Sequence, residues 1–208
     1  SNFTKNEIIA NTNIRSNITV IKNGIDKFWK SNKSYKNNNE ILYVGNIRKH
    51  KNVNLLINAF KNINNSSFKL LLIGNSDSYL KKNNFKNSNI KFIDEVDRKK
   101  LIEYYNNARL LVLPSRYEGF GFTPLESMAC DCPALVSDFS AIREICQDGA
   151  FYFNLDKEDD LKDKIMYLLN NEEVCDNLIK NGREIIRQYD WGKTVHETIK
   201  KIDKLLVN

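Results

Sequence analysis

The chain has 208 residues, of which 41% are hydrophobic and 28% charged, and these fractions are typical of a globular protein. Its formal net charge of +6 permits an anionic partner without identifying one. No apolar run is long enough to span a membrane, and no basic segment followed by an apolar one opens the chain, so we expect neither a transmembrane helix nor a signal peptide. The four cysteines include no C-x-x-C pair, so we expect reduced thiols in a cytoplasmic protein and no structural zinc.

Short apolar runs alternate with amphipathic segments along the chain. The apolar runs predict strands at residues 18–21, 41–45, 69–74, 90–93, 110–113, 133–136 and 150–153. The amphipathic periodicity predicts helices at residues 3–11, 53–63, 98–108, 161–170, 174–189 and 194–207. The polar stretch 31–39 predicts a linker or exposed loop. This alternation predicts an α/β fold, a Rossmann-like doubly wound parallel sheet that binds its ligand beyond the carboxyl ends of the strands.

The strongest local signal is the segment Glu118–Glu126, with sequence EGFGFTPLE, which follows the predicted strand 110–113. Thr123 is predicted to be the N-cap of a helix. Gly119 and Gly121 remove side chains next to this helix N-terminus, where free N–H groups favour an anion. A purely structural alternative stays open, in which the second glutamate completes a capping box, the first lies on a surface loop and the glycines serve the turn.

A second loop, Gly45–Lys51, follows the predicted strand 41–45 and is rich in cations. For Lys49 and His50 we favour the interpretation of a solvated basic loop. For Arg48 and Lys51 we favour phosphate contact, because a guanidinium fork and a compact ammonium both suit a diphosphate.

The two loops together predict a pocket for a ligand that carries both phosphate and hydroxyl groups. The helix N-terminus, Arg48 and Lys51 would neutralise the phosphates. Glu118 and Glu126 would accept hydrogen bonds from vicinal hydroxyls, as carboxylates do for ribose in dinucleotide-binding folds. A nucleotide sugar has both kinds of group.

At this point the sequence resembles a family, the group 1 retaining glycosyltransferases of the GT-B fold, in their C-terminal, donor-binding half. The resemblance covers nearly the whole chain, and its most specific motif is the E-x7-E segment Glu118–Glu126. The other matching segments are a helix start at Ser1–Lys5, a crossover into the second domain at Val20–Asp26, a phosphate loop at Val44–Asn52, the stretch Tyr105–Ser115 and an aromatic at Trp191.

The resemblance implies three parts. Residues 1–26 would be the tail of a missing N-terminal domain with the crossover segment, residues 27–189 the Rossmann-like donor-binding domain, and residues 190–208 the C-terminal helix. The implied activity is transfer of a sugar from a UDP- or GDP-sugar to an acceptor hydroxyl, with retention of configuration, in polysaccharide or lipopolysaccharide synthesis. No metal and no tightly bound cofactor is implied.

The implied acceptor is a glycan or a lipid-linked saccharide, which the N-terminal domain would hold. Peripheral contact of the full-length enzyme with the inner face of the membrane stays open. We expect these 208 residues alone to bind the donor weakly and not to turn over.

The family's site residues carry over by position. Glu118 and Lys51 are implied to be catalytic, with Glu118 on the donor sugar and Lys51 on the diphosphate. Glu126 would hold the ribose hydroxyls, and Val96 would place backbone groups against the base. The remaining donor-binding residues implied by the resemblance are Gly45, Asn46, Arg48, Gly119, Phe120, Gly121, Phe122 and Thr123.

One departure and several alternatives accompany the resemblance. Asn46 stands where the family usually has arginine, and we expect Arg48 to supply the missing charge. Among related GT-B enzymes, a nucleotide-sugar epimerase is disfavoured by the E-x7-E spacing, and a phosphorylase-like enzyme is disfavoured because no lysine context suggests a pyridoxal cofactor. A non-catalytic nucleotide-sugar binding module stays open. Nucleic-acid binding is disfavoured, because the charge is modest and the aromatics are not interleaved with basic residues.

Overall fold

The computed structural model describes residues 1–13, 17–32, 39–63, 65–75, 88–157 and 159–206. Within them, six strands form one parallel sheet in the order β3-β2-β1-β4-β5-β6. The strands are β1 (Glu40–Val44), β2 (Lys69–Ile73), β3 (Ile90–Ile93), β4 (Leu110–Leu113), β5 (Ala134–Ser137) and β6 (Phe151–Phe153). The helices are α1 (Asn2–Asn11), α2 (Val53–Lys61), α4 (Arg98–Asn107), α5 (Phe122–Ala129), α6 (Ser140–Cys146), α7 (Asp160–Leu169), α8 (Glu172–Ile186) and α9 (Trp191–Leu206), with short 3-10 turns η1 (Lys49–Lys51) and η2 (Gln147–Gly149).

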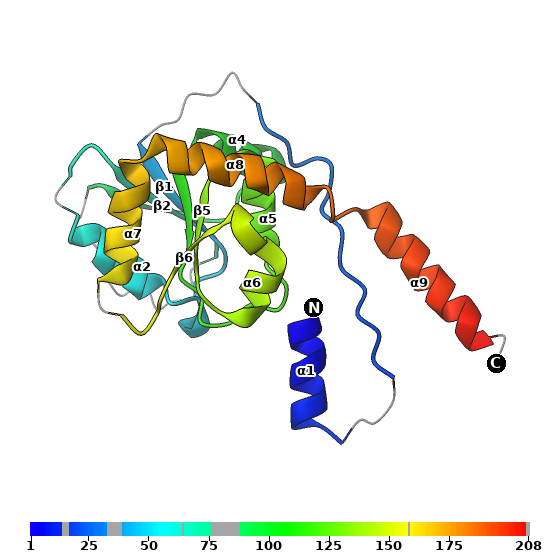
Figure 1. The fold of residues 1–208 in the computed structure, drawn as a ribbon. Helices are drawn as coiled ribbons and strands as arrows, with labels where there is room; N and C mark the ends of the chain where they lie inside the picture. The colour runs from blue at the N-terminus through cyan, green and yellow to red at the C-terminus, as the bar shows by residue number, and fades with distance from the viewer. Residues whose placement is uncertain (14–16, 33–38, 64, 76–87, 158, 207–208) are drawn as a thin grey trace.

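The predicted Rossmann-like doubly wound sheet is confirmed. From β1 the chain runs outward through β2 to β3, and it then returns so that β4 pairs with the other side of β1. The strands lie between α2 and α7 on one side and α5 and α6 on the other (Figure 1). Because both faces are covered, the central strands are apolar at successive positions, and β4 and β5 are buried along their whole length.

The prediction of a strand at residues 18–21 is wrong. These residues belong to no strand, because the segment that holds them runs along α1 and away from the sheet (Figure 1). The chain makes its first sheet-like contact at Ile25, which forms a single parallel bridge with Asp190. The short helix α6 was not among the predicted elements, since its seven residues give too little periodicity to stand out. Of the predicted loop 31–39, residues 33–38 lie outside the described residues.

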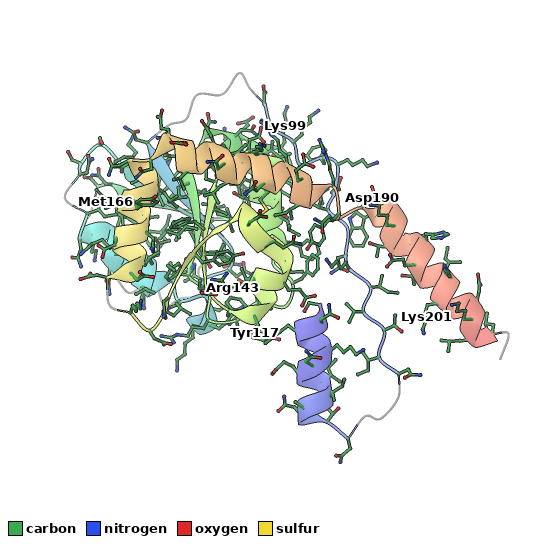
Figure 2. All side chains as sticks on the ribbon, in the orientation of Figure 1. Lys99, Tyr117, Arg143, Met166, Asp190 and Lys201 are labelled. Carbon is green, nitrogen blue, oxygen red and sulfur yellow. The ribbon has the colours of Figure 1, made fainter. Side chains whose placement is uncertain are left out.

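Two helices lie outside the sheet and its covering layers. The N-terminus of α1 is held by Glu144 of α6, whose carboxylate accepts from the backbone N–H groups of Asn2 at 2.8 Å and Phe3 at 2.9 Å. The helix α9 buries none of its described residues and projects from the body, with Asp190 at its base and Lys201 far out along it (Figures 1 and 2). None of the helices described here is long and apolar enough to cross a membrane.

Candidate functional site

The loops after β1 and β4 meet at the point where the strand order reverses. The strands are neighbours in the sheet, and a backbone hydrogen bond of 2.8 Å joins their loops, from the N–H of Arg116 to the carbonyl of His50. Tyr117, labelled in Figure 2, marks the loop after β4. Since doubly wound sheets bind ligands at this switch point, the two loops singled out in the sequence occupy the expected position.

The side chains of Lys51 and Glu118 form an ion pair at this junction. The Lys51 Nζ lies 2.7 Å from each carboxylate oxygen of Glu118, and the side chains are only 19% and 12% exposed. The buried Ser115 hydroxyl donates a further hydrogen bond of 2.6 Å to Glu118 Oε1. Burial, and secondly the charge of Glu118, raise the pKa of the Tyr43 hydroxyl beneath the pair, so this phenol stays protonated. The alternative that Glu118 is a plain surface residue is therefore wrong.

The helix α5 presents an uncapped N-terminus next to this pair. It begins at Phe122, and its N-cap is Gly121 with a φ of 102°, so the capping residue has no side chain that could accept from the first N–H groups. The prediction of Thr123 as N-cap is wrong, because Gly121 takes the left-handed conformation and starts the helix earlier. The first turn of α5 thus presents the N–H groups of Phe122 and Thr123, for which no acceptor is found among the described residues, and the positive end of the helix dipole.

The two glycines of the E-x7-E segment differ in what an added side chain would meet. A Cβ on Gly121 would lie 2.8 Å from Ile142 Cδ1, and the φ of Gly121 is one that other residues adopt only with strain. A Cβ on Gly119 would meet nothing within 4 Å, and its φ lies outside the left-handed region. The fold therefore explains Gly121, whereas Gly119 leaves open space beside the site.

Glu126 is held by a phenol and has no capping role. The Tyr105 hydroxyl donates to Glu126 Oε2 at 3.0 Å, and the Tyr105 ring packs edge-on against Trp29 with ring centroids 5.7 Å apart. Burial raises the pKa of Glu126 from its ordinary value, and the Tyr105 hydrogen bond and the charge of Arg98 offset part of this. The capping-box alternative is wrong, since the carboxylate bonds to Tyr105 on α4.

Close backbone packing holds the loop after β1. Gly45 has a φ of 146°, and a Cβ on Gly74, after β2, would lie 2.2 Å from the Gly45 carbonyl oxygen. Asn46 is exposed, and its carbonyl accepts a hydrogen bond of 3.3 Å from the Tyr43 hydroxyl. Gly74 was not among the residues predicted for the site, although it is a second glycine directly after a buried strand.

The other candidate residues are spread around this edge of the sheet. Val96 is half-buried in the loop after β3, and its role at a base stays a prediction. The rings of Phe120 and Phe122 contact each other with centroids 4.9 Å apart, and Phe120 also meets Tyr189 edge-on. These aromatics therefore brace the segment that carries the two glutamates.

A hollow of about 680 Å³, which we name the basic pocket, lies beside η1 and the start of α2. The described residues that line it are Ile47, Arg48, Lys49, Asn52, Val53, Asn54 and Arg116. Lys51, which points to Glu118, is not among them. Arg48, Lys49 and His50 are exposed, as the solvated interpretation of Lys49 and His50 expects. The expected compensation of Asn46 by Arg48 stays a prediction.

No group of His, Cys, Asp and Glu side chains within the described ranges is arranged to hold a metal ion. Each of the four cysteines is buried and free, and burial raises the pKa of each thiol, Cys130 and Cys132 to about 12. These thiols pack in the core and take no part in the site.

This α/β domain has cations, a helix N-terminus and two glutamates at its switch point. Such domains belong to the class of folds that bind phosphate-bearing cofactors and substrates. The profile of the family described as glycosyl transferases group 1 matches residues 24–185. The chain belongs to this family.

Two relatives show the extent of the match. The chain is 34% identical to an uncharacterised glycosyltransferase of Methanocaldococcus jannaschii, over 99% of this chain and 58% of the relative. It is 31% identical to the O-antigen chain mannosyltransferase RfbU of Salmonella typhimurium, over 91% of this chain and 54% of the relative. The chain thus spans little more than half the length of the curated relatives it matches.

Solved structures confirm the GT-B type of fold. The sucrose-phosphate synthase of Thermosynechococcus elongatus superposes with a TM-score of 0.86 at 21% identity, over all of this chain and 57% of the other. The Anabaena protein HepE, crystallised with UDP and glucose, superposes with a TM-score of 0.77 at 18% identity, over 89% of this chain and 57% of the other.

Proposed function

We propose that this chain is the donor-binding part of a retaining glycosyltransferase that moves a sugar from a nucleoside diphosphate sugar to a hydroxyl of a polysaccharide or lipopolysaccharide precursor. The observation that carries the proposal is the Lys51–Glu118 pair beside the uncapped N-terminus of α5, at the switch point of the sheet. Two comparisons support the class of substrate: RfbU is a mannosyltransferase of the O-antigen chain, and HepE binds UDP and glucose.

The diphosphate of the donor would lie between Lys51 and the first turn of α5. Lys51 supplies a positive charge, and the α5 N-terminus supplies free N–H groups at the positive end of its dipole. When the bond between the sugar and the diphosphate breaks, negative charge grows on the leaving diphosphate. Fixed cations and amides at that place stabilise the transition state without reorganising.

The two glutamates would hold the hydroxyl-bearing ends of the donor. Glu118, next to the open space at Gly119, would contact the sugar, and Glu126 would hold the ribose hydroxyls. The Tyr105 hydrogen bond occupies one oxygen of Glu126 and leaves the other to accept from a hydroxyl. Val96 would offer backbone groups to the base.

We also propose the division into residues 1–26, 27–189 and 190–208. The two boundaries meet in space, because Ile25 bridges to Asp190 and its N–H donates to the Tyr189 carbonyl at 3.1 Å. Because the chain matches little more than half of its relatives, we propose that turnover requires the part of them that it does not match.

Calorimetric titration with UDP, GDP and ADP tests the donor site. The expected result is saturable binding of one nucleotide that is lost in the double variant Lys51→Ala, Glu126→Ala. A matched control, Lys69→Ala with Glu173→Ala, removes one charge of each sign from exposed positions and should bind normally. Binding of no nucleotide by the folded chain, or equal binding by the site variant, would contradict the proposal.

A sugar-transfer assay tests the proposal that turnover requires the part of the relatives that this chain does not match. These residues alone should show no multiple turnover of UDP- or GDP-sugars with an acceptor glycan. Repeated turnover by the chain alone would show that the matched half is sufficient.

A further inference from the structure

The basic pocket is lined by three cations from two different loops. Arg48 and Lys49 come from the loop after β1, and Arg116 comes from the loop after β4. The hydrogen bond between Arg116 N–H and the His50 carbonyl ties the two loops together, so the cations are held around one hollow by fixed backbone.

These cations have no carboxylate partners in the part of the chain that the structure describes. None of the ion pairs found there involves Arg48, Lys49 or Arg116. No Asp or Glu is among the described residues that line the pocket. Clustered like charges repel one another, so an anion bound among them would be stabilised by all three.

A second observation points to a ligand in the same place. The side-chain amide nitrogen of Asn52 is buried and has no hydrogen-bond partner among the described residues. Asn52 lines the pocket and precedes α2 with a φ of 52°, and its side chain does not cap that helix. A buried amide donor without a partner costs free energy, and a rotation of the Asn52 side chain toward the pocket would let it donate to a bound acceptor.

We infer that the basic pocket is a second anion site, separate from the Lys51–Glu118 centre, that takes the phosphate of a phosphosaccharide. A hollow of about 680 Å³ exceeds the volume of a single phosphate and falls in the size range of small-molecule pockets. Asn52 and Asn54 offer amides to hydroxyl groups, and Ile47 and Val53 offer an apolar floor. Assigning the phosphosaccharide as the acceptor rests on the proposed function, whereas the anion site stands without it.

Titrations with inorganic pyrophosphate and with glucose 1-phosphate test the inference. The donor-site variant Lys51→Ala, Glu126→Ala serves as the background, so that binding there reports the second site. In this background both probes should bind, and adding Lys49→Ala and Arg116→Ala should weaken their binding by about tenfold or more, since tenfold is the usual worth of a single charge-assisted hydrogen bond. Adding Lys69→Ala and Lys99→Ala instead removes two equally exposed cations elsewhere and should leave binding unchanged.

Three results would overturn the inference. One is equal binding with and without Lys49 and Arg116, and another is loss of both probes in the donor-site background. The third is a chain that binds phosphatidylglycerol vesicles through Lys49 and Arg116 but does not bind glucose 1-phosphate. That result would mean that the basic pocket binds a lipid headgroup and not a phosphosaccharide. Failure of the proposed function gives a different pattern, in which no nucleotide binds but glucose 1-phosphate still depends on Lys49 and Arg116.

Discussion

Glu118 and Glu126 lie at the two ends of one short segment, yet their surroundings differ in kind. Glu118 holds the Lys51 ammonium with both oxygens and accepts a hydrogen bond from Ser115, so its charge is neutralised in place. Glu126 is also largely buried, but its direct partner is the neutral Tyr105 hydroxyl. The first carboxylate is fixed by a cation, whereas burial raises the pKa of the second, and this predicts different responses to substitution and to pH.

Removal of the Lys51 ammonium should have the largest effect. Lys51→Ala leaves the largely buried Glu118 carboxylate without its cation, so we expect a loss of about 2 kcal/mol in the free energy of unfolding. We also expect the affinity for the bound nucleoside diphosphate to fall by about tenfold or more. Urea denaturation and calorimetry measure the two quantities.

The double variant Lys51→Ala, Glu118→Gln is the matched control. It removes the unpaired charge and should recover most of the stability without recovering nucleotide affinity. If the double variant is as unstable as the single one, the ion pair is not the reason for the loss.

Alanine substitutions of the two glycines between the glutamates should have the next largest effect. Gly121→Ala should cost about 1–3 kcal/mol, because its φ is unfavourable for alanine and the new methyl group meets Ile142. Gly119→Ala should change the free energy of unfolding by less than about 0.5 kcal/mol but weaken nucleotide binding, because the methyl group enters the open space of the site. Equal destabilisation by both substitutions would mean that Gly119 is also required by the fold.

Tyr105→Phe should cost about 1 kcal/mol of stability, the usual worth of one hydrogen bond, since the ring keeps its packing against Trp29. Because the lost hydrogen bond lowers the pKa of Glu126, the substitution should raise that pKa further. The measurement is the pH at which half of the nucleotide affinity is lost, which should move upward. An unchanged midpoint would show that the Tyr105 hydroxyl does not affect the pKa of Glu126.

The pH dependence should be the smallest effect. The pKa of Glu126 in the folded chain lies above its ordinary value of 4.5, so between these two values the folded state binds the proton more tightly than the unfolded state does. Ionised Glu126 therefore lowers stability slightly at neutral pH, and this cost disappears as the pH falls through the window. Nucleotide affinity should fall in the same window, because protonated Glu126 accepts hydroxyl hydrogen bonds poorly. Glu126→Gln should flatten both profiles, and a persistent slope would assign it to another group.

The regular elements of the fold followed from local patterns. Short apolar runs predicted the six strands of the sheet, and the central runs are nearly continuous because strands covered on both faces have no solvent-facing side that needs polar residues. The same pattern misled at residues 18–21, where apolar residues lie on a connecting segment. A short apolar run indicates that its residues are buried, but it does not indicate whether a neighbouring strand is present to pair with them.

The candidate site was predictable in its position and less so in its contacts. Glycines and charges directly after two strands located the loops, since parallel strands present their carboxyl ends at one edge. The partners Ser115 and Tyr105 were not found, because each reaches its glutamate through tertiary packing. Thr123 was wrongly predicted to be the N-cap of α5, also because of tertiary packing. Gly121 adopts a left-handed conformation next to Ile142, and the helix begins directly after it.

The position of β1 between β2 and β4 also has a consequence for how the chain folds. The pairs β1–β2 and β2–β3 each join consecutive strands, so each pairing brings together residues that are comparatively close in the sequence. The pairing of β1 with β4 closes a much longer loop, and Lys51 and Glu118 are 67 residues apart in the sequence. Loop closure over that distance costs entropy and slows folding, so this pairing is expected late. A folding intermediate that contains only one half of the sheet lacks the ion pair, and on the proposed function it also lacks the nucleotide site, so nucleotide binding should report completion of the sheet.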